Sequence, residues 1–338
     1  MTQIEFPNLR RAMIISLLAM GLTGCDKPAP AVATGEQPAL VANMNSDVVT
    51  PLPQQIQLND KQVELGRRLF FDTRLSQDNT VSCAHCHPIS NYGVDSQRVS
   101  VGIHGQLDTA NAPTVLNSGF NFRQFWNGRA ATLEDQAAQQ VINPLEMGTS
   151  WPLVIDKLSQ DAQLDALSKQ AYGKSIDKSV VLAAIATFER SLITPNAPFD
   201  RYLRGDKTAI SAQAQAGWQL FQQLGCVSCH QGMNVGGNMY EKIGVMNNFF
   251  NGRPLQPVDY GRYTVTHEEQ DKFKFKVPSL RNVAKTAPYF HDGSAATLPK
   301  AVNTMARVQL GLTLTPQQAD EIVAFLKSLT GTLPKVQP

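Results

Sequence analysis

Apolar residues recur along much of this chain every three or four positions, which is the spacing of an amphipathic helix. The pattern predicts a helix over 63–71 and a second, buried helix over 179–192. A further helix is predicted to begin after Thr315, since Thr315, Pro316 and Gln318 are residue types favoured at the N-cap, first and third positions of a helix. Few stretches alternate apolar and polar residues, so we expect an all-α fold with few strands.

The N-terminus shows a different pattern. Two arginines precede an apolar run over 12–22, which is shorter than the about 20 residues that a membrane-spanning helix needs. The run ends in Leu-Thr-Gly-Cys at 22–25, which resembles a bacterial lipoprotein processing site. We therefore expect residues 1–24 to be a signal peptide and Cys25 to carry lipid. The alternative is an ordinary secretory signal followed by an unmodified Cys25.

An internal repeat runs through the rest of the chain. A Gly-x-x-Leu-Phe pattern occurs at 66–70 and again at 217–221. A Pro-(Thr/Ser)-x-x-Asn pattern occurs at 113–117 and again at 278–282, and the Gly, Thr and Leu that follow it repeat with the same offset of 165 positions. We therefore expect one domain that was duplicated and then specialised.

Length and composition give the domain organisation. The 338 residues suffice for about two domains, and 42% hydrophobic with 17% charged residues is typical of a soluble globular protein. Residues 25–55 are rich in Pro, Ala, Thr and Asn without an apolar period, so we expect a flexible tether there, followed by domains over 56–197 and 198–338. The formal net charge of +2 gives no basic field, so nucleic acid is not an expected partner.

The most specific chemistry lies in two Cys-x-x-Cys-His motifs, which begin at Cys83 and Cys226. This motif is the attachment signature of c-type haem, in which two thiols bind one porphyrin and the histidine becomes an axial iron ligand. A pair of zinc or thioredoxin-like sites is the alternative, but no further cysteine completes a zinc set. The sequence thus predicts two covalently bound haem c groups, held by these residues: Cys83, Cys86 and His87 for the first, and Cys226, Cys229 and His230 for the second.

For the remaining axial ligands, the sequence offers several candidates. His104 lies in a Gly-Ile-His-Gly stretch, 17 residues after His87, so it could be a sixth ligand on a mobile loop or simply a surface histidine. Met305 lies in a helical stretch, where a methionine normally packs in the core. Five other methionines compete for the same role: Met44, Met147, Met233, Met239 and Met246.

Several longer motifs resemble one family. They lie at 65–72, 82–88, 111–117, 125–129, 275–282 and 287–293. Together they resemble the bacterial dihaem cytochrome c peroxidases, which are related to the methylamine-utilisation dihaem enzymes. The resemblance extends from about residue 58 to residue 329.

This resemblance implies a role for each matching position. Met305 matches the distal methionine of the high-potential haem, where the methylamine-utilisation branch has tyrosine. His104 matches the removable ligand of the low-potential, peroxidatic haem. Trp126 matches the aromatic residue between the haems, although a Trp there could also be a core residue. Gln136 and Glu146 match the distal pocket, where they would orient peroxide and move its proton.

The resemblance also implies a calcium ion between the haems. Asn111 and the backbone carbonyls of Thr286 and Pro288 match its ligands. Oxygen donors suit this hard cation.

The implied function is the reduction of hydrogen peroxide to water in the periplasm. Electrons from a small donor protein, such as a cytochrome c or a cupredoxin, would enter at the C-terminal haem, and peroxide would react at the N-terminal haem. The lipid on Cys25 would anchor the protein to the inner membrane, and the family implies a homodimer. The alternatives are a dihaem electron-transfer cytochrome without peroxidase activity, a dihaem enzyme that oxidises a partner protein, and a redox sensor.

Overall fold

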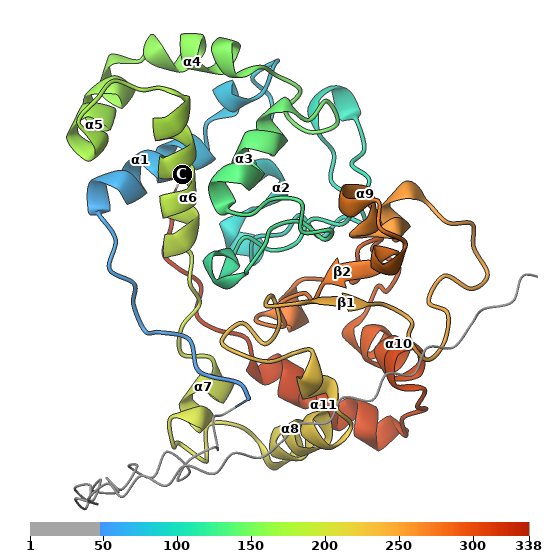
Figure 1. The fold of residues 1–338 in the computed structure, drawn as a ribbon. Coiled ribbons are helices and arrows are strands. Elements are labelled where there is room, and N and C mark those ends of the chain that lie inside the picture. The colour runs from blue at the N-terminus through green and yellow to red at the C-terminus, as the bar shows by residue number, and fades with distance from the viewer. Residues whose placement is uncertain (1–47, 338) are drawn as a thin grey trace, which may run out of the picture. The chain divides into compact units, whose positions relative to one another are not determined.

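Helices make up most of the regular structure in the computed structural model, which describes residues 48–337 (Figure 1). The α-helices are α1 (Asp60–Phe70), α2 (Cys83–Cys86), α3 (Leu133–Ile142), α4 (Trp151–Ser159), α5 (Ala162–Tyr172), α6 (Lys178–Ser191), α7 (Pro198–Leu203), α8 (Ala212–Gln223), α9 (Tyr263–Thr266), α10 (Leu298–Leu310) and α11 (Pro316–Ser328). Strands β1 (Tyr240–Lys242) and β2 (Lys274–Lys276) pair antiparallel, with Tyr240 opposite Lys276. The predicted, mostly helical fold with few strands is confirmed for the described residues.

Local capping explains where the predicted helices begin. Helix α1 begins three residues before its predicted start, because the side chain of Asn59 accepts hydrogen bonds from the next turn. Helix α6 begins after Asp177, whose carboxylate accepts from the amide of Val180. Helix α11 begins with the predicted cap, and the side chains of Thr315 and Gln318 each bond the other's backbone amide.

Two helix pairs cross in the same way, α1 on α6 and α8 on α11, and Figure 1 shows the second pair side by side. In each pair a glycine allows the helices to approach closely. A side chain at Gly66 would overlap the carbonyl oxygen of Ala184, and one at Gly217 would overlap that of Glu321. These are the glycines of the repeated Gly-x-x-Leu-Phe pattern, so both copies of the pattern serve the same packing.

The repeated asparagines also occupy equivalent places. Asn117 and Asn282 have the same left-handed backbone conformation, with φ 61° and ψ 12°. Each donates its backbone amide to the residue that follows a paired helix, Leu192 after α6 and Leu329 after α11. Both side-chain amides then donate to the hydroxyl of Thr194, at 2.8 and 3.0 Å. The two halves therefore meet at Thr194 in a matching way, and their origin by duplication stays a prediction.

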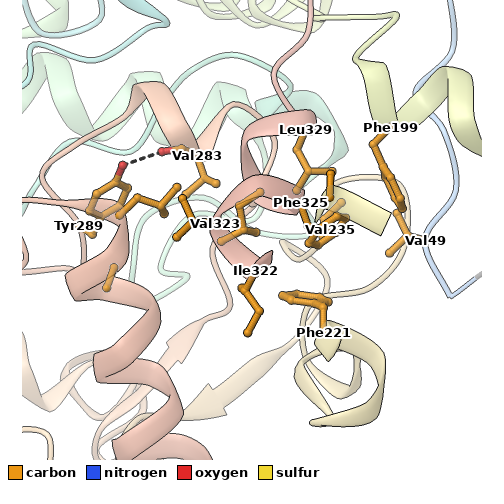
Figure 2. Packing of buried hydrophobic residues seen from close by; sticks show 14 of the residues in the cluster. Val49, Phe199, Phe221, Val235, Val283, Tyr289, Ile322, Val323, Phe325 and Leu329 are labelled. Atoms are coloured by element: carbon orange, nitrogen blue, oxygen red, sulfur yellow. Dashed lines mark hydrogen bonds between the residues drawn. The ribbon is translucent and has the colours of Figure 1, made fainter. Parts of the chain in front are cut away.

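The largest apolar cluster of the C-terminal half lies between α8, α10 and α11. Figure 2 shows Phe221, Ile322 and Phe325 within it, and the hydroxyl of Tyr289 donates to the carbonyl of Val283. In the N-terminal half, two further clusters lie around α1 and α6. These clusters fix the helices that support the two motif-bearing loops.

Each end of the described chain packs on the opposite half. Val49 and Leu52 are buried, Val49 within the C-terminal cluster, although both belong to the predicted tether over 25–55. Leu333 and Val336 pack on the N-terminal half beside α1. The segment from residue 48 onward is therefore fixed by packing and is not a free tether.

The remaining N-terminal predictions lie outside the described residues. These are the signal peptide over 1–24, the lipidation of Cys25 and the tether up to residue 47. Within residues 48–337, no helix has the length and apolar character needed to cross a membrane.

Candidate active site

A large apolar cavity lies mainly in the C-terminal half. We call it the C-terminal cavity, and it is lined by Cys226, Cys229, His230 and Met305, with apolar residues of α8, α10 and α11 around them. Among the methionines of the described residues, Met305 alone lines this cavity; Met147 is packed in the other half and Met246 is exposed. The structure therefore brings the predicted ligand pair His230 and Met305 to one space.

The second cavity, which we call the N-terminal cavity, contains the other motif. It is lined by Cys86 and His87, with Gln136, Glu146 and Trp126 around them. Cys83 begins the short helix α2 and packs against the apolar clusters of this half. The structure thus brings Cys86, His87, Gln136 and Glu146 to one cavity, whereas neither Cys83 nor His104 lines it.

Both motif histidines are prepared as metal ligands. The Nδ1 atom of His87 lies 3.0 Å from the carbonyl oxygen of Gly93, and that of His230 lies 3.4 Å from the carbonyl of Val235. A hydrogen bond from Nδ1 leaves the Nε2 lone pair for a metal. Burial lowers the pKa of His230 to about 4, so its ring is neutral at pH 7.

The pKa values of the motif thiols are not those of a redox-active dithiol. Burial raises the pKa of Cys86 and of Cys226 to about 11. A thioredoxin-like cysteine needs a lowered pKa to form its thiolate, so these sites do not have that character. Two thiols, one neutral imidazole and an adjacent cavity instead fit a c-type haem at each motif.

One wall of the N-terminal cavity comes from α3 and the turn after it. Gln136 and Gln140 lie one helical turn apart on α3, and both line the cavity. The carboxylate of Glu146 accepts a 2.6 Å hydrogen bond from the side chain of Asn143. Burial, reinforced by the negative charge of Asp108, raises the pKa of Glu146 to about 8.

His104 lies away from this cavity. Its side chain is 60% exposed, and its Nδ1 lies 3.4 Å from a carboxylate oxygen of Asp78. The loop that carries it is joined to the turn after α3, because the amide of Ile103 donates to the carbonyl of Glu146 at 2.9 Å. His104 is therefore not among the residues that line the N-terminal cavity.

Trp126 lies where the two cavities share a wall. It lines both of them, and its indole N–H donates to the carbonyl oxygen of Asn111 at 2.8 Å. Its ring meets that of His291 edge to face, with the ring centres 6.3 Å apart. Lys276 also lines both cavities, and its backbone amide donates to the carbonyl of Trp126 at 2.8 Å.

The predicted calcium ligands also come together. Asn111, Thr286 and Pro288 all line the C-terminal cavity. The side-chain nitrogen of Asn111 donates to the carbonyls of Gln97 and Arg98, at 2.9 and 3.3 Å. That arrangement leaves its side-chain oxygen for a cation.

The comparisons with known proteins agree with this arrangement. Residues 60–208 match the family model for di-haem cytochrome c peroxidase, and residues 214–330 match the model for cytochrome c. The cytochrome c551 peroxidase of Nitrosomonas europaea is 40% identical over 329 residues, covering 96% of this chain and 93% of that protein. This chain belongs to the di-haem cytochrome c peroxidase family.

Other members of the family fit the same conclusion. The cytochrome c peroxidase of Escherichia coli (strain K12) is 47% identical over 287 residues, covering 85% of this chain, but the chain spans only 62% of that protein's length. A solved MauG-like protein associated with microbial copper homeostasis covers 83% of this chain and is itself covered to 95%, with a TM-score of 0.73 and 28% identity. The predicted family, the enzyme class of dihaem peroxidase and the two haem-bearing domains are confirmed.

Sequence reasoning missed some of the cavity residues. Gln140 is one helical turn from Gln136, and that spacing could have indicated it. Lys276 lies within a quoted family motif, yet nothing in the sequence distinguishes a buried lysine from an exposed one. Glu189, which is buried and lines the N-terminal cavity, gave no signal beyond its place on the buried helix α6.

Proposed function

We propose that this chain reduces hydrogen peroxide to water in the periplasm, with electrons from a small donor protein such as a cytochrome c or a cupredoxin. In the overall reaction, peroxide takes up two electrons and two protons and gives two waters. The observation that supports this most is the N-terminal cavity, in which Glu146 and Gln136 lie on the wall while His104 lies outside. Peroxidase relatives support the same reaction.

The two halves would divide the work. Cys83, Cys86 and His87 would hold the haem of the N-terminal cavity, and the donor set at Cys226 would hold the other. When bound, the haems supply redox-active iron for electron transfer and for peroxide reduction. We propose that electrons enter at the C-terminal domain and that peroxide reacts in the N-terminal domain, with the domains divided near residue 197.

The protein groups would act on the proton and on the position of peroxide. Glu146 would transfer a proton between the two peroxide oxygens, for which a pKa near 8 is well matched to neutral pH. Gln136 would orient peroxide by hydrogen bonding. His104, on the exposed 102–105 loop, would be the removable ligand.

Three further features belong to the same proposal. Asn111 with the carbonyls of Thr286 and Pro288 would hold calcium beside the shared wall. Cys25 would carry the lipid that anchors the protein to the inner membrane. The protein would act as a homodimer.

The decisive experiment is peroxide-dependent oxidation of a reduced cytochrome c by the purified holoenzyme. We expect turnover after prior one-electron reduction of the enzyme, because that reduction would release His104. Absence of turnover both before and after this reduction would instead favour an electron-transfer cytochrome. Oxidation of a protein partner without cytochrome c turnover would favour the partner-oxidising alternative, although Met305 in place of tyrosine argues against it.

A further inference from the structure

The side chain of Lys276, on β2, is an unusual buried cation. The residue is 5% exposed. Within residues 48–337 its ammonium group has no hydrogen bond or ion pair, and burial alone lowers its pKa, to about 8. Lys274, two positions earlier on the same strand, is one-third exposed and pairs with Asp271 at 3.0 Å. Lys274 is thus paired near the surface, whereas Lys276 on the same strand is buried and unpaired. The first can serve as a control for the second.

The surroundings of Lys276 supply no compensating anion. It lines both cavities where they share a wall, beside Trp126 and Phe275. Carboxyl groups do line these cavities, namely Asp108, Glu146 and Glu189 in one and Glu241 in the other. None of these carboxylates affects the pKa of Lys276, which is lowered by burial alone.

A buried and unpaired charge is unfavourable by several kcal/mol, so a fold that retains one usually provides a counter-ion. At this position the counter-ion must come from the occupants of the cavities. Each c-type haem carries two propionate carboxylates, which are anions of the right charge and can accept an ammonium hydrogen bond. A haem propionate therefore has both the charge and the position needed to pair with Lys276.

We propose that Lys276 binds haem propionate at the wall between the two cavities and thereby raises the reduction potential of the haem it contacts. The proposal rests on the two haem sites and not on peroxide turnover. The direction follows from charge: a nearby cation disfavours the ferric form, which carries one more positive charge than the ferrous form. Loss of the ammonium group would also leave the propionate charge uncompensated, which favours the ferric form further.

The test is a redox titration of purified holoenzyme, followed by the absorbance of each haem. We expect Lys276→Met to lower the ratio of reduced to oxidised haem at a fixed potential by at least tenfold for at least one haem, which is about 59 mV. Lys276→Arg should stay close to the parent, because it keeps the charge. Lys274→Met, which removes an equal charge from the same strand, should leave both potentials unchanged.

Haem content is measured first, as the pyridine haemochrome, so that poor loading is not mistaken for a redox effect. If Lys276→Met does not load haem, Lys276→Gln provides a second neutral side chain. Failure of both neutral variants to load, with normal loading of Lys276→Arg, would also support the proposal, because haem binding would then depend on the charge. Unchanged potentials in a fully loaded neutral variant, an equal shift in Lys274→Met, or loss of loading in Lys276→Arg as well would overturn it.

Discussion

At the scale of single residues, Glu146 shows how burial would prepare the proposed acid–base group. The carboxyl group is removed from water at the wall of the N-terminal cavity and lies near the negative charge of Asp108. Both effects favour its neutral form, while the 2.6 Å bond from Asn143 favours the charged form without reversing the balance. The result is a pKa of about 8, near the value that suits proton transfer at neutral pH.

Replacement of this group should therefore abolish most of the activity. We expect Glu146→Gln to lower peroxidase turnover about a hundredfold or more, which is the usual contribution of a general acid–base group. In the parent, Glu146 must be ionised to accept the first proton, and the ionised form predominates above its pKa of about 8, so the rate should fall as the pH is lowered through that value. The measurement is steady-state turnover from about pH 6 to about pH 10, with the exposed Glu268→Gln as control. Full turnover in Glu146→Gln would contradict the assignment.

The residue scale also shows what the sequence could indicate. The Cys-x-x-Cys-His motifs predict their chemistry because attachment requires those residues in direct succession. The roles of Glu146 and Gln136 could be predicted only from the family resemblance, since an isolated Glu or Gln in a sequence looks like any surface residue. The sequence predicts no role for Lys276, because its burial depends on residues that are far away in the chain.

At the scale of elements, the glycine crossings are the clearest case of sequence dictating packing. Gly217 lies within α8, where alanine would normally be the better helix former by about 1 kcal/mol. A side chain at this position would overlap the carbonyl oxygen of Glu321 on α11. For Gly217→Ala, helix propensity therefore predicts a gain in stability, whereas packing predicts a loss.

We expect packing to decide the outcome for Gly217→Ala. The overlap is with backbone, which cannot rotate away, and overpacking of this kind typically costs about 1–3 kcal/mol. The net loss of stability should be up to about 2 kcal/mol, measured by urea unfolding of the holoenzyme. The exposed Gln213→Ala on the same helix is the control and should be nearly neutral. A Gly217→Ala midpoint equal to or above that of the parent would show that α8 and α11 can move apart freely.

The elements differ in how well the sequence predicts them. Helices α1, α6 and α11 are predicted because their apolar spacing and caps are local. Strands β1 and β2 have three residues each and pair Tyr240 with Lys276, so no local pattern could reveal them. That small sheet nevertheless brings Lys276 to the shared wall, and for this reason sequence reasoning could not complete the site.

At the scale of the whole described molecule, the two cavities are chemically unequal although their supporting frames match. Both frames have a glycine crossing and an asparagine bound to Thr194. The N-terminal cavity adds Gln136 and Glu146 on its wall, whereas the C-terminal cavity is lined by both Met305 and His230. A polar pocket on one side and a thioether on the other are what a division between peroxide chemistry and electron uptake requires.

The proposed division predicts that Met305 controls electron uptake without touching peroxide. A thioether ligand raises the potential of a haem relative to a second imidazole, so Met305→His should lower the potential of the C-terminal haem. We expect at least a tenfold shift in the ratio of reduced to oxidised haem, about 59 mV, and a matching loss of turnover with a cytochrome c donor. The measurements are redox titration and donor oxidation kinetics, with the exposed Met246→His as control. An unchanged potential in Met305→His would exclude it as the ligand, and a lowered potential with unaltered donor kinetics would place electron uptake at the other haem.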